Sequence, residues 1–396
     1  MSLTIELSER LKALPPYLFV EMDRAKREAK KAGRDIIDLG IGDPDTPTPS
    51  PIVEALIKAV KDPTNHRYAL DAGLPELREE ISRWFTRRFG VTLDPEGEIY
   101  PLIGCKEGLG HLPLGLINPK DKVILPDPAY PAYQAAIGFA EGKITFVPLK
   151  ESQQFLPDLK KIRDIKNAKL MYINYPNNPT AATASKSFYE ELVAMAKDKG
   201  MILISDLAYS EIYFDGEKPA SLLEVDGAKE VAIEFHSFSK TYNMTGWRLG
   251  WACGNRQLIA TLSKVKTNYD SGVFQAIQQA GIAALRDTQP EDLDLLRALY
   301  QERRDLLIHG VRNLGWKITP PKAAFYVWAK IPKGFANSLE TAKVFLEKAD
   351  IVVTPGIGFG KAGESYIRLA LTVSKERILE AIQRLERVLV TQVAKT

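Results

Sequence analysis

The sequence contains little cysteine or histidine and no strong excess of charge of either sign. Its two cysteines, Cys105 and Cys253, are too few for the disulfide framework of a small secreted domain. The four histidines lie far from any paired cysteines, so we expect no zinc site and no other metal site. Because 53 Lys and Arg stand against 50 Asp and Glu, we expect no polybasic surface and no nucleic-acid partner.

Long apolar runs are also absent. No segment reaches the length of a membrane span, and charged residues interrupt the first 16 residues, where a secretory signal needs an unbroken apolar stretch. We therefore expect a cytoplasmic protein with no membrane partner. The length of 396 residues allows two or three domains, since a typical domain has roughly 150 residues.

Short apolar runs alternate with amphipathic helical patterns through most of the chain. This alternation is typical of a parallel sheet with helices packed on it. From about residue 290 the pattern changes to a long charged helix, two extended stretches and a final helix. The predicted strands are 122–126, 169–174, 201–206, 231–236, 325–329 and 366–371, and the predicted helices are 17–32, 187–199, 257–266, 291–313 and 375–393.

These elements predict an α/β fold with two closely joined domains. A large domain over residues 46–288 should hold the mostly parallel sheet between helices. A smaller α+β domain should combine residues 1–45 with residues 289–396, because the first helix precedes the main alternation and should pack with the carboxyl-terminal part. No internal repeat or Gly/Ser-rich linker separates the two parts.

Three glycines in the carboxyl-terminal part match the dinucleotide-binding pattern G-x-G-x-x-G: Gly358, Gly360 and Gly363. That pattern requires a preceding strand and a following helix, whose first N–H groups hold the pyrophosphate. Here Pro355 interrupts the approach and an extended stretch follows. We therefore interpret the glycines as a flexible loop at the edge of the smaller domain.

A chemically richer segment follows the predicted strand 231–236. Lys240, taken alone, is one of 53 basic residues, and most lysines are exposed on the surface. Its apolar neighbours should desolvate the ammonium, lower its pKa and make it an amine nucleophile for a carbonyl. Ser237, Ser239 and Arg248 offer the hydroxyl and guanidinium donors that bind a phosphate dianion. The apolar neighbours are Phe238, Tyr242, Met244 and Trp247.

Two other strand ends carry polar groups. Asp206 ends the run 201–206, at the edge where open α/β sheets place their ligands, and Tyr209 follows three residues later. Asn178 lies in an Asn- and Pro-rich loop after the strand 169–174. Each has an ordinary alternative, since aspartate, asparagine and proline are common in turns. Together with the lysine and the phosphate-binding groups, they indicate a site for a phosphorylated heteroaromatic aldehyde.

Three motifs, in this order, resemble the class I/II pyridoxal-phosphate-dependent aminotransferases of fold type I. They are N-N-P-T at 177–180, S-D-x-x-Y at 205–209 and S-F-S-K-x-x-x-M-x-G-x-R-x-G at 237–250. The resemblance covers essentially the whole chain and implies a seven-stranded sheet. Longer phrases, among them LGIGDPDTPTP, PDPAYPAY and INYPNNPT, resemble the branch of this family that acts on LL-diaminopimelate.

The resemblance implies a role for each group around the cofactor pyridoxal 5′-phosphate. Lys240 should anchor the cofactor covalently and act as a general base. Asp206 should pair with the ring nitrogen, while Tyr209 and Asn178 should bind the phenolic oxygen. Tyr130 should stack on the ring. The residues implied for the phosphate are Ser237, Ser239, Arg248, the backbone N–H groups of Cys105 and Lys106, and Tyr68 of the partner subunit.

The resemblance also implies a substrate site. Arg368 should bind the α-carboxylate through a bidentate pair and so fix the orientation of the Cα–H bond. Because two residues should reach in from a second subunit, the resemblance implies a homodimer with shared active sites. The further substrate contacts that it implies are Tyr17, Gly42, Lys106, Tyr130, Asn178 and Asn268 of the partner subunit.

The sequence departs from the family pattern at three places. Ala181 stands where the family usually has glycine after N-P-T, so this loop must tolerate a Cβ. The segment 69–73 differs from the version expected in the diaminopimelate branch, although Asp71 offers a carboxylate there. Cys105 replaces a small residue whose backbone should act, and we expect no effect from that change.

The activity implied by the resemblance is reversible transamination between LL-2,6-diaminopimelate and 2-oxoglutarate, giving tetrahydrodipicolinate and glutamate in lysine biosynthesis. An aminotransferase of the same fold acting on alanine, aspartate or N-acyl-diaminopimelate is the main alternative. A C–S lyase shares the fold and the lysine. A non-enzymatic pyridoxal-sensing regulator would need a DNA-binding appendage, for which the chain has no room.

Overall fold

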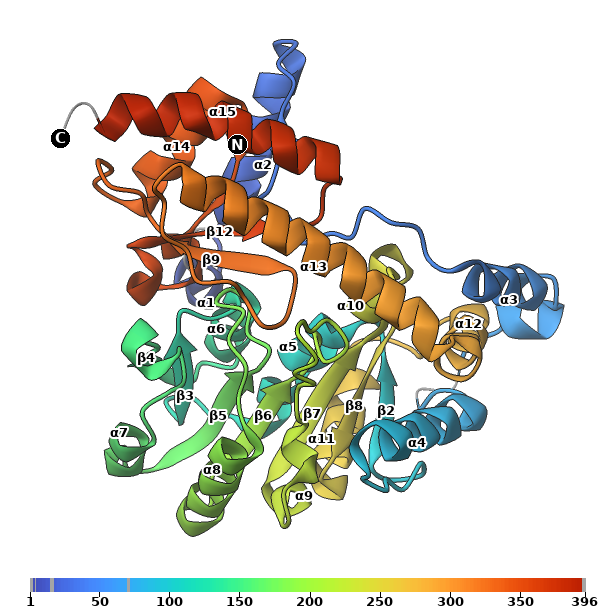
Figure 1. Cartoon of the computed structure of the whole chain (residues 1–396). Helices are drawn as coiled ribbons and strands as arrows, with labels where there is room; N and C mark the ends of the chain where they lie inside the picture. Colours follow the sequence, from blue (N-terminus) through green and yellow to red (C-terminus); the bar gives the residue numbers. More distant parts are fainter. Residues whose placement is uncertain (1–2, 4, 15–17, 70–71, 394–396) are drawn as a thin grey trace.

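The computed structural model describes residues 3, 5–14, 18–69 and 72–393. Its main element is a sheet of seven strands in the order β2-β8-β7-β6-β5-β3-β4, in which only β8 runs antiparallel to its neighbours (Figure 1). This confirms the predicted mostly parallel α/β fold. The strands are β2 (Ile99–Leu102), β3 (Lys122–Asp127), β4 (Lys143–Pro148), β5 (Ala168–Asn174), β6 (Ile202–Asp206), β7 (Ala232–Ser237) and β8 (Gly250–Gly254).

Helices cover both faces of this sheet, because successive strand residues point to opposite sides. Val123 and Leu125 face one core, which includes α5, α6 and α11, whereas Ile124 faces the other, which includes α4, α8 and α12. Helix α3 packs against α12 and projects beyond β2 (Figure 1). The helices are α3 (Ser50–Val60), α4 (Pro75–Phe89), α5 (Cys105–Leu116), α6 (Pro131–Phe139), α8 (Lys186–Lys199), α11 (Arg256–Lys266) and α12 (Gln275–Asp287).

A second, smaller core lies beside the sheet. Strands β11, β12 and β9 form an antiparallel three-stranded sheet in that order, and a short parallel pair joins β1 to β10. The elements are α2 (Leu18–Lys31), β1 (Ile37–Asp38), α13 (Pro290–Asn313), β9 (Tyr326–Lys330), α14 (Ser338–Ala349), β10 (Ile351–Val352), β11 (Thr354–Pro355), β12 (Tyr366–Ala370) and α15 (Lys375–Val393).

The amino-terminal segment packs against carboxyl-terminal elements in a small cluster of its own. Met22 and Ala29 of α2 pack with Val352 and Leu346. Ile37 of β1 also lies opposite Ile351 of β10 in the parallel pair. The division of the chain into domains at residues 45 and 289 stays a prediction. Within the described part of the chain, no helix combines the length and the apolar character that crossing a lipid bilayer requires.

The glycine-rich segment near residue 360 differs from the flexible edge loop that we expected. It forms two short 3-10 turns, and the extended strand β12 follows. The backbone N–H of Ala129 donates to Phe359 O at 2.8 Å, and that of Ala362 donates to Asp127 Oδ1 at 3.1 Å. A Cβ on Gly360 would lie 2.0 Å from the same carboxylate oxygen. The prediction of a flexible loop was therefore wrong, because this loop packs closely against the end of β3.

Candidate active site

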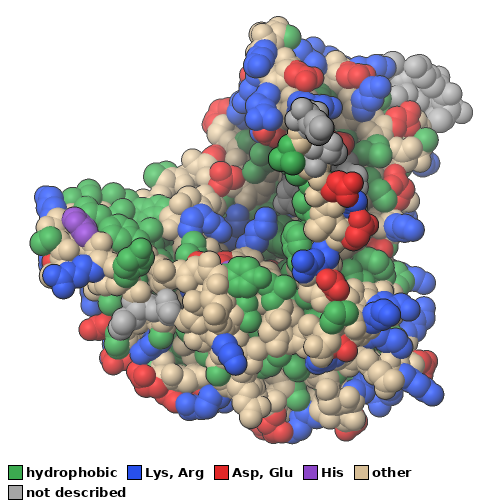
Figure 2. All heavy atoms as spheres, turned by 180° about the vertical axis from the view of Figure 1, so that it is seen from behind, with side chains coloured by type: hydrophobic (Ala, Val, Ile, Leu, Met, Phe, Trp, Pro, Cys, Tyr) green, Lys and Arg blue, Asp and Glu red, His purple; other side chains and the backbone are tan. Residues whose placement is uncertain are grey.

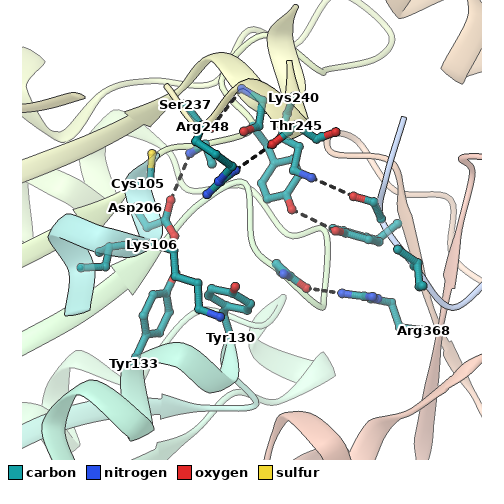
Figure 3. Close-up of a pocket in the computed structure, with 18 residues that line it drawn as sticks. Cys105, Lys106, Tyr130, Tyr133, Asp206, Ser237, Lys240, Thr245, Arg248 and Arg368 are labelled. Atoms are coloured by element: carbon teal, nitrogen blue, oxygen red, sulfur yellow. Dashed lines mark hydrogen bonds between the residues drawn. The ribbon is translucent and has the colours of Figure 1, made fainter. Parts of the chain in front are cut away.

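A cavity of about 260 Å³ opens at the carboxyl ends of β5, β6 and β7, where the large sheet meets β9 and β12 (Figure 3). Residues from distant parts of the chain meet here because the parallel strands all end at this edge. The cavity is lined by these residues expected at the site: Gly42, Cys105, Lys106, Tyr130, Asn178, Asp206, Tyr209, Ser237, Ser239, Lys240, Arg248 and Arg368.

Lys240 lies in the short helix α10 (Phe238–Thr241), directly after β7. Its Nζ donates to the carbonyl oxygen of Gly42 at 2.7 Å and lies 5.5 Å from the ring centre of Phe325. Burial lowers the pKa of Lys240 to about 8; the carboxylate of Asp43 opposes this shift, and the guanidinium of Arg368 adds to it. A substantial fraction of this amine is therefore uncharged near neutral pH.

The side chains around Lys240 are not the ones that the sequence suggested. Phe238, Tyr242 and Met244 pack into the core on the far side of the sheet. Residues four apart share one face of a helical turn, so Phe238 and Tyr242 point together and Lys240 points away from them. The aromatic ring beside the ammonium belongs to Phe325, which no local pattern around residue 240 could indicate.

Asp206 ends β6 inside the cavity and is only 6% exposed. Its Oδ2 accepts from the hydroxyl of Tyr133 at 2.5 Å, and its Oδ1 accepts from the backbone N–H of Ala208 at 3.2 Å. Burial raises the pKa of this carboxyl group, and the bond from Tyr133 only partly offsets that effect. A cationic ligand beside Asp206 would therefore be favoured. Sequence reasoning missed Tyr133, although it lies one helical turn after Tyr130.

Arg368 lies on the opposite side of the cavity (Figure 3), where it is bonded to Asn178. The Nη1 of Arg368 donates to Asn178 Oδ1, and its Nη2 donates to Gly40 O, both at 2.7 Å. The guanidinium lies over the rings of Tyr326 and Phe359, at 4.1 Å and 4.8 Å from their centres. This arginine is 3% exposed, so its charge faces little competing water.

The loop that carries Asn178 accommodates alanine at position 181. Ala181 has a left-handed backbone with φ of 58°, a conformation that glycine adopts with less strain. Its N–H donates to Asn177 O at 2.8 Å, and its side chain is buried in the smaller core. The loop therefore tolerates a Cβ, as the sequence required.

The other end of the cavity is suited to an anion. Helix α5 begins at Cys105, so its first backbone N–H groups are free of partners within the helix. The guanidinium of Arg248 lies against Gly104, where an added Cβ would come within 2.4 Å of Nη2. Arg248 itself has φ of 56° and donates to Thr245 O at 2.8 Å. Ser237 and Ser239 line the same cavity.

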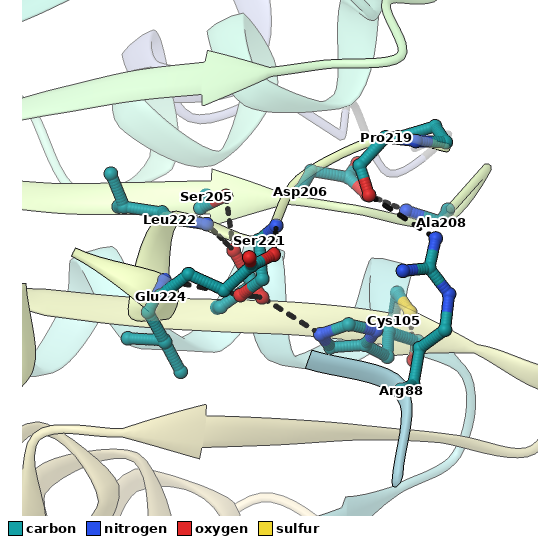
Figure 4. A network of polar contacts seen from close by, with 12 residues as sticks. Arg88, Cys105, Ser205, Asp206, Ala208, Pro219, Ser221, Leu222 and Glu224 are labelled. Atoms are coloured by element: carbon teal, nitrogen blue, oxygen red, sulfur yellow. Dashed lines mark hydrogen bonds and ion pairs between the residues drawn. The ribbon is translucent and has the colours of Figure 1, made fainter. Parts of the chain in front are cut away.

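A buried hydrogen bond holds the start of α5 against β7, and a buried polar network lies next to it. The thiol of Cys105 donates to the backbone carbonyl of His236 at 2.6 Å (Figure 4). The side chain of His236 donates to the fully buried carboxylate of Glu234, which also accepts from the hydroxyls of Ser205 and Ser221. Cys105 thus has a positioning contact through its side chain, beyond the backbone role that the sequence suggested.

A cluster of charged side chains lies on the outer side of α5. Glu107, His111 and Asp270 place one potential ligand atom each within 4.8 Å of one another. The ammonium of the fully buried Lys266 donates to Glu107 at 2.8 Å and also to Asp270. Because this lysine already provides the countercharge, the carboxylates form an ion-pair network that links α5 to the end of α11.

Two of the expected site residues lie among the described residues but do not line the cavity. Tyr68 is 91% exposed, and Asn268 is an exposed residue just after α11, whose Nδ2 donates to Lys264 O of that helix. Tyr17 lies outside the described residues, as do the positions 70 and 71 of the unusual segment 69–73. The single chain therefore does not bring Tyr68 or Asn268 to its own site.

The chain matches the family model "Aminotransferase class I and II" over residues 34–385. It is 52% identical to the LL-diaminopimelate aminotransferase of Aquifex aeolicus (strain VF5) and 50% identical to that of Nitratidesulfovibrio vulgaris (strain Miyazaki F). Both alignments span 383 residues, 96% of this chain and 98% of each relative.

Solved structures show the same fold. Apo-BacF from Bacillus subtilis has a TM-score of 0.93 at 41% identity, covering 98% of both chains. A single mutant of Thermus thermophilus aspartate aminotransferase has a TM-score of 0.91 at 31% identity, covering 97% of this chain and all of that one. The family match, the relatives and the shared fold together show that this chain belongs to the class I and II aminotransferases.

Proposed function

We propose that the protein transfers the amino group of LL-2,6-diaminopimelate to 2-oxoglutarate, giving glutamate and a keto product that cyclises to tetrahydrodipicolinate, as a step of lysine biosynthesis. The observation that carries the reaction type is one cavity that holds the lowered-pKa amine of Lys240, the buried carboxylate of Asp206 and the buried guanidinium of Arg368. The choice of substrate rests on relatives that carry the name LL-diaminopimelate aminotransferase.

The residues present fit pyridoxal 5′-phosphate, the cofactor on which this family generally depends. Ser237, Ser239, Arg248 and the first N–H groups of α5 would hold its phosphate. Asp206, whose carboxylate has no bonded cation among the described residues, would pair with the protonated ring nitrogen. When bound, the cofactor supplies an electron sink for the negative charge that develops at the substrate Cα.

The remaining side chains would orient that ring. Tyr130 would stack against it, while Tyr209 and Asn178 would donate to its phenolic oxygen. Tyr209 stays protonated as a donor, since burial raises its pKa well above the ordinary value. Lys106 also lines the cavity and would bind the substrate beside Gly42.

Arg368 would bind the substrate, and Lys240 would transfer its proton. Arg368 would bind the α-carboxylate through its forked N–H groups and so direct the Cα–H bond toward the amine of Lys240. With a pKa of about 8, Lys240 is uncharged often enough near neutral pH to accept that proton as a general base. The same amine would then give this proton up again as the amino group is transferred, and so act as a general acid.

A homodimer would complete the site with Tyr68 and Asn268 of the partner subunit. The region around Tyr68 carries exposed apolar side chains on α3 and at the start of α12: Ile57 is 49% and Phe274 is 41% exposed. These two helices project beyond β2, where the space-filling view shows a broad hydrophobic surface (Figures 1 and 2). Contiguous apolar surfaces of this kind mark protein interfaces.

A panel of amino donors tests the reaction. With 2-oxoglutarate as the acceptor and glutamate formation as the readout, LL-diaminopimelate should react faster than alanine, aspartate or N-acyl-diaminopimelate. Faster turnover of one of those three would refute the substrate assignment. Release of pyruvate and ammonia from cystathionine, without glutamate formation, would refute transamination and favour a C–S lyase.

A mixing experiment tests the shared active site. Lys240→Ala and Tyr68→Ala should each be nearly inactive alone, but their mixed dimers contain one site with both native residues. After random exchange of subunits, about a quarter of the wild-type activity should return, since half of the dimers are mixed and each has one intact site of two. Absence of any recovery, with exchange verified by mass spectrometry, would refute the shared site.

A further inference from the structure

Tyr326 of β9 contacts three segments of the candidate site at once, although no sequence motif indicated it. Its hydroxyl oxygen lies 2.9 Å from that of Tyr209. Its ring lies under the guanidinium of Arg368, 4.1 Å from ring centre to Cζ. Its hydroxyl also packs against Gly42, where an added Cβ would lie 2.0 Å from the oxygen. The side chain is 3% exposed, so these contacts are fixed by packing.

We propose that Tyr326 is a positioning residue with two separable roles: its hydroxyl orients the phenol of Tyr209 toward the cofactor, and its ring holds the plane of Arg368 for the substrate carboxylate. The inference rests on the proposed function and adds a residue to it. Tyr209 follows a strand of the large sheet, whereas Tyr326 and Arg368 are neighbours on the three-stranded sheet. One side chain thus joins the two halves of the site.

The direction of the hydroxyl pair follows from the number of protons available. Each phenol has one proton, so if Tyr209 donates its own to the phenolic oxygen of the cofactor, it can only accept from Tyr326. Tyr326 then donates to Tyr209, and the resulting chain of two hydrogen bonds strengthens the outer one by polarisation. Removing the hydroxyl of Tyr326 should therefore weaken the donation by Tyr209 without removing it.

The ring acts on Arg368 by a different contact. A guanidinium is planar and prefers to stack on aromatic faces, and here Tyr326 and Phe359 both lie against it. Its Nη1 and Nη2 bonds to Asn178 and Gly40 fix the positions of the two nitrogen atoms, and the two rings support the plane from its faces. Phenylalanine at position 326 retains this stacking surface, whereas leucine removes it.

The test uses Tyr326→Phe, Tyr326→Leu and Tyr209→Phe, with Tyr300→Phe as the matched control. Tyr300 is a fully buried tyrosine of the same core that does not line the cavity, and its hydroxyl has no hydrogen-bond partner among the described residues. The first readout is the pH midpoint of the visible absorbance of the bound cofactor. The second is the dissociation constant of 2-oxoglutarate, measured by calorimetry.

Tyr326→Phe should shift the pH midpoint in the same direction as Tyr209→Phe, by about 10–30% as much, because that is the strengthening expected along a hydrogen-bond chain. In the Tyr209→Phe background, the Tyr326→Phe change should add no further shift. Tyr326→Phe should leave the 2-oxoglutarate dissociation constant within about twofold, while Tyr326→Leu should raise it about tenfold. Tyr300→Phe should change neither quantity.

Additive shifts in the double variant, or an equal shift from Tyr300→Phe, would overturn the hydroxyl role. Equal losses of 2-oxoglutarate affinity in Tyr326→Phe and Tyr326→Leu would overturn the ring role. If the wild-type protein showed no visible absorbance with the cofactor, the proposed function itself would fail. A wild-type protein that absorbs and titrates, with variants that do not move the midpoint, would refute only the inference about Tyr326.

Discussion

The amine of Lys240 should be reactive toward an acylating reagent near neutral pH even without the cofactor. Burial lowers its pKa from 10.5 to about 8. At about pH 7.5, an amine with that pKa is about one quarter uncharged, whereas an amine with a pKa of 10.5 is about 0.1% uncharged. The uncharged fraction is thus about 200 times larger, and only the uncharged amine attacks an acylating reagent.

Trace acetylation of the cofactor-free protein with acetic anhydride measures the uncharged fraction of the Lys240 amine. The rate at each lysine is followed by mass spectrometry between about pH 6 and 11, and an exposed lysine such as Lys31 provides the reference for reagent decay. The acetylation rate at Lys240, corrected for its accessibility, should rise to its plateau with a midpoint at about pH 8, whereas the ordinary value for lysine is 10.5.

Two charge variants should move the acetylation midpoint of Lys240 in opposite directions. Asp43→Asn removes a carboxylate that raises the pKa of Lys240, so the acetylation midpoint should fall. Arg368→Gln removes a cation that lowers it, so the midpoint should rise. A wild-type midpoint near 10.5, or shifts of the same sign in both variants, would refute the account of burial and neighbouring charge.

Three further predictions concern single side chains. Lys240→Ala should lose the visible absorbance of the bound cofactor and at least about 100-fold of its turnover, measured by spectroscopy and glutamate formation; coloured, fully active protein would refute its role as anchor. Burial raises the pKa of Asp206 in the folded protein, so protonation of this carboxyl group favours the folded state. Its contribution to the free energy of unfolding is full below the unfolded pKa of 3.8 and is lost as pH rises through the folded pKa. Cofactor-free Asp206→Asn should therefore be more stable than wild type near pH 7, by urea unfolding; a less stable variant would contradict this. Lys266→Met leaves Glu107 and Asp270 without their shared cation and should lower the free energy of unfolding by about 3–5 kcal/mol, whereas an unchanged urea midpoint would show that the pair needs no countercharge.

Local patterns predicted most of the fold. The strand expected at 201–206 is Ile202–Asp206, and the helix expected at 187–199 is Lys186–Lys199. Ser185 caps that helix by accepting from the N–H of Phe188, and Gly200 ends it with φ of 61°. These capping residues lie within a few residues of the helix boundary that they set, so the local sequence is enough to predict the boundary.

The candidate site could be predicted only in part. Asp206 and Lys240 were identifiable because one ends a buried strand and the other follows one, and parallel strands end at one edge of the sheet. Tyr326 was missed because its partners Tyr209 and Arg368 are 117 and 42 positions away in the chain. The glycine loop was misread as flexible because its contact with Asp127 lies more than 200 positions away.

The sequence by itself determined the alternation of strands and helices and the polar residues at the strand ends. Hydrophobic periodicity and capping depend only on residues close together in the chain. Only the tertiary structure decided which ring lies beside Lys240, which phenol bonds to Asp206 and which ring supports Arg368. Those contacts depend on how two cores pack against each other, and desolvation at their junction sets the protonation of the groups enclosed there.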